Sequence, residues 1–317
     1  MKATAPGPAP GVRTVEIDPE RAGQRVDNYL MRELKSVPRA WVYRVLRKGE
    51  VRVNGRRIKP DYRLAAGDRL RIPPVRVRAG GAAARPAAWL EERILYEDRD
   101  LLVLDKPSGM AVHGGSGVSQ GVIEALRATR KDARFLELVH RLDRETSGCL
   151  LIAGRRSALR RLHELLRRGA VEKRYLALVA GDWREPRWID APLRKNTLRG
   201  GERVVRVSEA GKAARTRFEP LTRFGEATLV EAVLDTGRTH QIRVHAAHAG
   251  HPLAGDPRYG DEAFNRRMRA LGLRRLFLHA HRLAFSSGED RPPVDVSAPL
   301  PEDLAAVLDR LGDGAGS

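Results

Sequence analysis

Asp143 is the residue whose surroundings most favour covalent chemistry. It lies in the stretch VHRLDRETSG (139–148), with Arg141 and Arg144 close on either side. Nearby positive charge favours the ionised carboxylate, and a nucleophilic aspartate must be ionised. An apolar run at 149–152 follows directly, so the loop adjoins a buried strand. An aspartate in such a loop is also a common turn residue or cap, so both interpretations stay open from the residues alone.

A second polar stretch, DTGRTHQIRVH (235–245), offers a partner for that carboxylate. Thr239 can cap a helix that runs to Ala249, with Gly250 as the left-handed residue after it. Arg243 then lies one turn into the helix, where it can reach inward to a carboxylate. At ~4 Å such a pair is worth about 4 kcal/mol at an effective dielectric of 20, before desolvation. The alternative is a phosphate-binding helix N-terminus without catalysis.

Two further features belong to the candidate site. In KRYLALV (173–179), strand alternation places Tyr175, Ala177 and Val179 on one face. A tyrosine there is either part of the core or a platform on which a base stacks. The other feature is a glycine-bearing loop, KPSGMAVH (106–113), paired with the β-type run LFLHA (276–280).

The elements that must position these residues alternate between strand and helix. Apolar β-type runs occupy 101–104, 149–152, 175–179 and 228–234, and a helix with a leucine face covers 157–168. There is no strict strand–helix–strand repeat, which favours an α+β fold with a mixed sheet.

The segment 24–73 has a different organisation. Apolar residues recur at helical spacing twice, around Tyr29 and around Val45, and Gly49 follows as a helix-ending residue. A short strand, the tight-turn pair Asn54-Gly55 and a second β-type run come next. The pattern predicts a helix pair followed by a small sheet.

Charge is concentrated in this smaller segment. The chain carries a formal net charge of +19, and residues 21–80 hold 17 Lys or Arg against 5 Asp or Glu. Such a concentrated positive field indicates a polyanionic partner, most simply a nucleic acid. A solvated basic face is the other interpretation of charge alone.

Length and composition restrict the class of protein. The 317 residues suggest two domains, and the single cysteine excludes a disulfide framework and suits the cytosol. No apolar run reaches the ~20 residues of a membrane span, and the N-terminus lacks the apolar core of a secretory signal. We therefore expect a cytoplasmic protein, without an obligate oligomeric interface. The expected boundaries are a flexible arm at 1–20, a basic module at 21–80, a linker at 81–90, the larger domain at 91–310 and a flexible tail at 311–317.

The basic module resembles the S4 RNA-binding domain, through RVDNYL, GEVRVNG and GDRLRI. The resemblance implies RNA binding by the helix pair. The basic residues expected to contact phosphates are Arg32, Lys35, Arg39, Arg44, Arg47 and Lys48. Such contacts supply salt-dependent affinity and little sequence information.

The larger domain resembles the RluA-type pseudouridine synthases. The motifs KPSGMAVH, HRLDRETSG, KRYLALV, GRTHQIRVH and LFLHAHRL occur in family order between about 100 and 285. The resemblance implies isomerisation of uridine to pseudouridine in RNA, with ribosomal RNA of the large subunit (23S) as substrate. It also implies that no metal, redox cofactor or cosubstrate is needed.

The resemblance assigns roles to residues at the motif positions. Asp143 is the implied nucleophile, attacking either C1′ of the ribose or C6 of the base, and Arg243 pairs with it. Tyr175 stacks on the target base, which must be flipped out of the RNA. Arg141 fills the vacated stack, and His140 contacts RNA or satisfies a hydrogen bond of its own loop. The remaining expected substrate contacts are Leu278, Lys106, His113 and Gln241.

The sequence disfavours three other functions. A zinc site at His240, His245, His248 and His251 is disfavoured, because helical spacing scatters these side chains around the axis. A non-catalytic RNA-binding assembly factor is disfavoured by the presence of Asp143, Tyr175 and Arg243 together. A hydrolase with an aspartate nucleophile is disfavoured by the RNA-binding module and the lack of a histidine placed to activate water.

Overall fold

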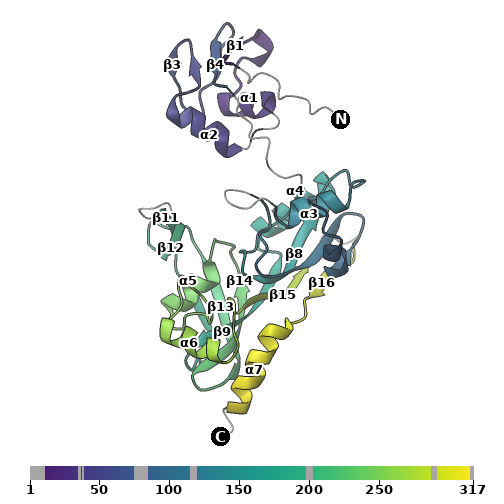
Figure 1. Cartoon of the computed structure of the whole chain (residues 1–317), viewed down its shortest axis with the longest axis vertical. Coiled ribbons are helices and arrows are strands. Elements are labelled where there is room, and N and C mark those ends of the chain that lie inside the picture. Colours follow the sequence, from purple (N-terminus) through teal and green to yellow (C-terminus); the bar gives the residue numbers. More distant parts are fainter. Residues whose placement is uncertain are drawn as a thin grey trace, which may run out of the picture. The chain divides into compact units, whose positions relative to one another are not determined.

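The chain forms two compact units, Met1–Gly81 and Ala82–Ser317, in a computed structural model (Figure 1). The structure describes residues 11–34, 37, 39–74, 85–114, 120–197, 203–286 and 291–314.

The smaller unit is a helix pair on a four-stranded antiparallel sheet with the order β1-β4-β2-β3. Its elements are β1 (Arg13–Glu16), the 3-10 helix η1 (Pro19–Arg21), α1 (Val26–Glu33), α2 (Arg39–Lys48), β2 (Arg52–Val53), β3 (Arg56–Arg57) and β4 (Arg69–Ile72). The expected helix pair and sheet are both present. Gly49 follows α2 with φ +70°, and Asn54 and Gly55 both have positive φ in the turn between β2 and β3.

The expected flexible arm at 1–20 is wrong for its second half. Strand β1 pairs along its whole length with β4, and the next residue, Ile17, is buried in the core of this unit. Asp18 caps η1 by accepting a hydrogen bond from the backbone of Arg21. The short strand was missed because four residues with one buried position carry almost no periodicity.

The larger unit is built on one ten-stranded mixed sheet. Its strands are β5 (Ile94–Glu97), β6 (Leu101–Lys106), β7 (Glu137–Leu138), β8 (Ser147–Ala153), β9 (Glu172–Ala180), β10 (Arg187–Asp190), β13 (Arg215–Arg223), β14 (Ala227–Leu234), β15 (Leu278–Phe285) and β16 (Val294–Ser297). A separate hairpin is formed by β11 (Leu193–Thr197) and β12 (Arg203–Val207). The helices are the 3-10 helix η2 (Ala88–Arg93), α3 (Val122–Thr129), α4 (Arg156–Arg167), α5 (Gln241–His248), α6 (Glu262–Ala270) and α7 (Glu302–Gly314).

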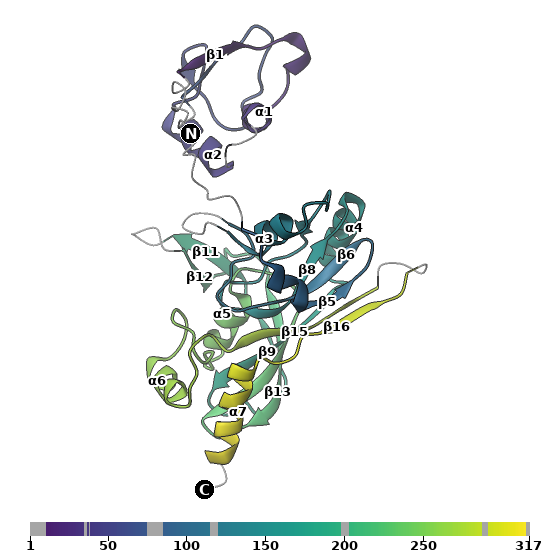
Figure 2. The same ribbon diagram turned by 45° about the vertical axis from the view of Figure 1, so that its right-hand side comes forward.

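The main path of the sheet runs β10-β13-β14-β9-β15-β8-β6-β5. Figure 2 shows β15 in the middle, between β9 and β8. The β15–β8 pair is parallel, whereas the other pairs of this path are antiparallel. The sheet is therefore mixed and the fold is α+β, as the alternation of strands and helices predicts.

Alternation along the strands divides the core between the two faces of the sheet. On β8, Leu150 and Ile152 belong to the cluster that includes residues of η2, α3 and α5, whereas Leu151 belongs to the cluster that includes α4. On β9, Tyr175 and Ala177 face the first of these clusters, and Leu178 packs with α6 and α7. The face with Tyr175 is the one on which the polar loops gather.

Two of the expected boundaries of the larger unit are corrected. Leu90 was placed in a linker at 81–90, but it is fully buried in the core, because η2 packs on the sheet. The expected tail at 311–317 begins inside α7, and Leu311 is buried against α6 and β14 neighbours. Among the residues that the structure describes, no helix is long and apolar enough to cross a membrane.

Candidate active site

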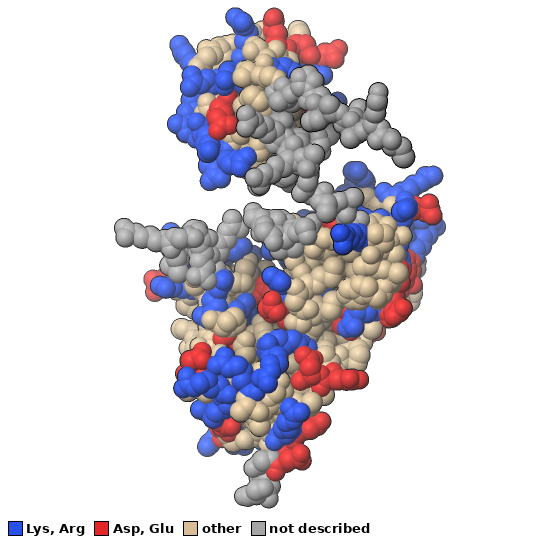
Figure 3. All heavy atoms as spheres, in the orientation of Figure 1, with Lys and Arg blue, Asp and Glu red and all other residues tan. Residues whose placement is uncertain are grey.

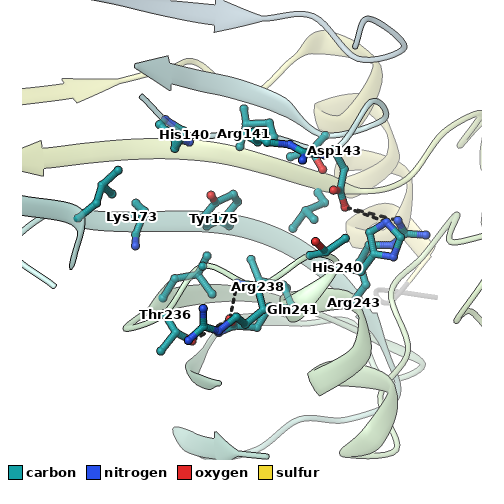
Figure 4. A pocket seen from close by; sticks show the side chains of 18 of the residues that line it. His140, Arg141, Asp143, Lys173, Tyr175, Thr236, Arg238, His240, Gln241 and Arg243 are labelled. Carbon is teal, nitrogen blue, oxygen red and sulfur yellow. Dashed lines mark hydrogen bonds and ion pairs between the residues drawn. The ribbon is translucent and has the colours of Figure 1, made fainter. Parts of the chain in front are cut away.

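A pocket of about 660 Å³ opens between the loop before β8, strand β9 and the N-terminus of α5. The loop supplies Asp143, the strand supplies Tyr175, and the helix supplies Arg243. Figure 4 shows these three side chains around one space. Three motifs that are far apart in the sequence thus meet at one site.

Asp143 is partly accessible and faces two basic side chains. Its side chain is 28% exposed, and Oδ2 lies 3.5 Å from Nη1 of Arg243 and 3.8 Å from Nε2 of His240. Its own carbonyl accepts a hydrogen bond from the backbone of Thr146, which closes a turn. The carboxylate therefore points into the pocket with one accessible edge, as a group that reacts with a bound substrate must.

Arg243 makes its strongest contact with another carboxylate, Asp256. Nε and Nη2 of Arg243 each donate to Asp256 over 2.7 Å, and both side chains are buried. Burial alone lowers the pKa of Arg243, but the hydrogen bond and charge of Asp256, with a smaller effect of Asp143, raise it overall. The guanidinium therefore stays charged, and its orientation is fixed before any substrate binds.

Sequence reasoning did not find Asp256 as part of the site. Burial raises its pKa, but the stronger combined effect of Arg243 and the backbone N–H groups of Arg258 and Tyr259 lowers it overall. The stretch GHPLAGDPRYGD contains this residue, and an acidic residue in a Gly- and Pro-rich loop gives no sign of its partner. Only the fold brings the loop beneath α5.

His240 is a second residue of the site that the sequence did not identify, apart from the disfavoured zinc interpretation. It precedes α5 with φ +54°, and Nδ1 is hydrogen-bonded to the hydroxyl of Tyr259 at 2.8 Å. Thr239 was expected as the helix cap, but His240 occupies that position and no side chain caps the helix.

Burial lowers the pKa of His240, so it faces Asp143 as a neutral ring near neutral pH. The expected end of the helix is correct, since Gly250 follows it with φ +85°.

Tyr175 and Leu278 form apolar walls of the pocket. Both are buried, and they belong to the paired strands β9 and β15. Burial, and then the charge of Asp143, raises the pKa of Tyr175, so the phenol keeps its proton at neutral pH. A planar base fits such walls by stacking and apolar contact.

Lys106 does not reach the pocket, contrary to the expected substrate contact. It is fully buried, and Nζ donates to the carbonyl oxygens of Pro107, Met110 and Arg144. Burial lowers its pKa to about 7. Because Arg144 adjoins Asp143, this lysine ties the 106–110 loop to the loop of the carboxylate.

Two further expected substrate contacts are not supported by the geometry. Gln241 lines the pocket, but its amide donates to Arg215 and Thr216 and accepts from Thr236 and Arg238, so all four hydrogen-bonding positions are used. His113 is exposed and lies outside the pocket lining. Both residues are polar and lie in motifs, which is why a substrate contact was predicted. In the structure, Gln241 is hydrogen-bonded within the protein, and His113 lies away from the pocket.

His140 and Arg141, which precede the turn at Asp143, differ in their roles. His140 accepts a hydrogen bond at Nε2 from the backbone of Leu151, and burial lowers its pKa to about 4. The loop hydrogen bond, one of its two expected roles, is therefore present. Arg141 is exposed at the pocket, and its side chain makes no hydrogen bond or ion pair with the described residues.

The smaller unit presents its expected basic residues on the helix pair. Arg32, Arg44, Arg47 and Lys48 are exposed. Lys35 and the side chain of Arg39 lie outside the described residues. Lys and Arg outnumber Asp and Glu on the face of this unit that Figure 3 shows.

The chain matches two family models and closely resembles curated proteins. The model for RNA pseudouridylate synthase matches residues 100–248, and the model for the S4 domain matches residues 24–70. Ribosomal large subunit pseudouridine synthase C of Pasteurella multocida is 55% identical over 306 residues, covering 95% of this chain and 94% of the relative. The protein of that name from Escherichia coli (strain K12) is 55% identical over 310 residues, covering 95% and 97%.

Solved structures agree with the fold of the larger unit. Human RNA pseudouridylate synthase domain containing 4 matches with a TM-score of 0.60 and 28% identity, covering 71% of this chain and 95% of that one. Human RNA pseudouridylate synthase domain containing 1 matches with a TM-score of 0.56 and 26% identity, covering 71% and 94%.

Proposed function

The chain belongs to the RNA pseudouridylate synthase family, and from that membership we propose that it isomerises uridines of 23S ribosomal RNA with Asp143 as the nucleophile. The ion pair between Asp143 and Arg243 at the mouth of a pocket walled by Tyr175 and Leu278 carries the assignment of the residues. The substrate follows from the names of the curated relatives, which act on the large ribosomal subunit.

The reaction breaks the bond between C1′ and N1, turns the uracil and joins C5 to C1′. Asp143 bonds either to C1′ or to C6 of the base, and it is released when the C–C bond has formed. The proton on C5 is lost and N1 gains one, so atoms and charge balance without a cosubstrate. Arg243 orients the carboxylate through their ion pair, and Tyr175 stacks on the base.

A base within folded RNA must leave its stack to reach this pocket. Arg141 is exposed beside the pocket and free of partners among the described residues, which suits insertion into the vacated stack. The basic helix pair of the smaller unit supplies affinity for the RNA backbone, and we expect a monomer in the cytoplasm.

Mapping of pseudouridines tests this proposal. Ribosomal RNA from wild-type and gene-deletion cells is derivatised with carbodiimide and analysed by mass spectrometry. We expect specific 23S pseudouridines to disappear on deletion and to return with the wild-type gene but not with Asp143→Asn. An unchanged pseudouridine map excludes the synthase, and restoration by Asp143→Asn excludes this nucleophile. If the protein is a non-catalytic assembly factor, any pseudouridine that is lost on deletion should return with the wild-type gene and also with the Asp143→Asn gene.

A further inference from the structure

Lys173 is a buried lysine of the pocket that the mechanism above leaves without a role. It is 8% exposed and lines the pocket from strand β9. Among the residues that the structure describes, its ammonium makes no hydrogen bond or ion pair. Lysine is almost never buried without a partner, because desolvation of the charged form is costly. Nζ of Lys173 is not one of the fully buried atoms that lack a hydrogen-bond partner, so it is accessible from the pocket, where a bound molecule can become its partner.

The position of Lys173 in β9 places it near one edge of a base that stacks on Tyr175. Lys173 and Tyr175 are alternate residues of β9, so their side chains leave the same face about 6.6 Å apart along the strand. Figure 4 shows Lys173 at the end of the pocket away from Asp143, with Tyr175 between them. A base stacked on Tyr175 with its C1′ end at Asp143 turns its opposite edge toward Lys173. In uracil that edge carries O4, because C4 stands across the ring from N1.

Both open routes of the reaction place negative charge on that oxygen. If Asp143 attacks C1′, the electron pair of the C1′–N1 bond leaves with the uracil and is delocalised over O2 and O4. If Asp143 adds to C6, the pair of the C5–C6 bond moves to C5, which is conjugated with O4. A cationic donor at O4 therefore stabilises the transition state by either route.

The other charged groups that line the pocket suit a different part of the substrate. Arg141, Arg167 and Arg238 are exposed at the rim, where the phosphates of RNA can reach them. Asp235, also exposed, supports the charge of Lys173, whose pKa burial lowers, and Lys173 in turn disfavours the charged form of His140. Lys173 differs from these three arginines in being buried, on the same strand as Tyr175, which suits a contact with the base and not with the phosphates.

We propose that Lys173 is a catalytic residue whose ammonium donates a hydrogen bond to O4 of the flipped uracil and stabilises the negative charge that develops there. This inference rests on the proposed function.

The test measures single-turnover pseudouridine formation and RNA affinity separately, on full-length protein with a 23S ribosomal RNA transcript. We expect Lys173→Met to lower the rate at saturating protein by about 10²- to 10³-fold, the usual effect of removing one such donor. RNA affinity should stay within a few-fold. The matched control is Lys131→Met, at an exposed lysine outside the pocket, and both quantities should match the wild type.

Chemical rescue distinguishes loss of the ammonium group from misfolding of the variant. Lys173→Ala removes three carbons and the nitrogen, so added propylammonium should restore part of the rate and tetramethylammonium should not. A wild-type rate for Lys173→Met overturns the inference, as does an unchanged saturating rate with weakened RNA binding, which indicates a phosphate contact. Lack of rescue with intact RNA binding also overturns it. If the wild-type protein forms no pseudouridine, the proposed function fails, and this inference fails with it.

Discussion

Asp256 accepts two hydrogen bonds of 2.7 Å from Arg243, and this pair leaves Nη1 of the guanidinium as the atom that faces Asp143. The arginine is thus held by a carboxylate that is shielded from substrate. The carboxylate exposed to substrate receives only the longer contact of 3.5 Å. Asp143 can therefore move onto a substrate atom without releasing the arginine.

Replacing Asp256 should destabilise the larger unit as well as slow the reaction. Asp256→Ala leaves a buried guanidinium without its main partner, which costs about 3–5 kcal/mol. Urea unfolding measures the loss, and single-turnover kinetics measure the effect on rate. The control is Asp295→Ala, since Asp295 forms a similar two-bond pair with Arg282 but is exposed. Equal losses for the two variants would contradict the role given to burial.

Asp143→Asn should abolish pseudouridine formation, to below about 10⁻⁴ of the wild-type rate, as expected for loss of a covalent nucleophile. RNA affinity, measured by filter binding, should change only a few-fold, because the side chain keeps its size and the basic helix pair is unaffected. Asp132→Asn, at an exposed loop position, is the matched control. Residual turnover well above that level, not explained by deamidation of the asparagine, would remove Asp143 from its role.

Gly148→Ala should displace the loop of the nucleophile. Gly148 has φ +106°, and a Cβ there would lie 2.2 Å from the carbonyl oxygen of Ala280, where β8 runs beside β15. Gly225 also has a positive φ, but a Cβ there meets no atom within 4 Å. We expect Gly225→Ala to cost about 1 kcal/mol and Gly148→Ala several times more, measured by urea unfolding. Similar losses of unfolding free energy for the two variants would contradict this prediction, because they would show that β8 and β15 move apart easily at Gly148.

Stability should rise with pH between about 4 and 6.5, in part through His140. Burial lowers its pKa to about 4 in the folded protein, so the unfolded chain binds a proton below pH 6.5 that the folded protein does not. This contribution reaches about 1.4 kcal/mol per pH unit and is complete above pH 6.5. His140→Gln should reduce the slope in urea unfolding, although the similarly buried His279 retains its part. A slope unchanged by His140→Gln would contradict the prediction.

The affinity for ribosomal RNA should depend on salt mainly through the smaller unit. Replacing Arg44, Arg47 and Lys48 together with Gln should reduce the slope of log affinity against log salt by about 2, since each lost phosphate contact removes about 0.7 to 0.9. The single-turnover rate at saturating protein should stay unchanged, because Asp143 and Arg243 are untouched. An unchanged salt slope would place the phosphate contacts elsewhere.

The sequence by itself determined the motifs and part of the secondary structure. Apolar periodicity located the helix pair around Tyr29 and Val45 and the main strands, because those positions must be buried at a fixed repeat. The setting of Asp143 and the spacing that places Arg243 one turn into a helix also followed from local rules. The concentration of positive charge in residues 21–80 indicated a polyanionic partner, and the motifs of that segment indicated RNA.

Only the tertiary structure decided which polar residues face the substrate and which face the protein. We expected substrate contacts from Lys106, Gln241 and His113. Lys106 and Gln241 are instead hydrogen-bonded to the backbone and to neighbouring side chains, and His113 lies away from the pocket. Asp256, Lys173 and the left-handed His240 gain their importance from contacts or burial set by distant segments. Hydrogen-bond partners and burial depend on chain segments far apart in sequence, so no local pattern of residues can reveal them.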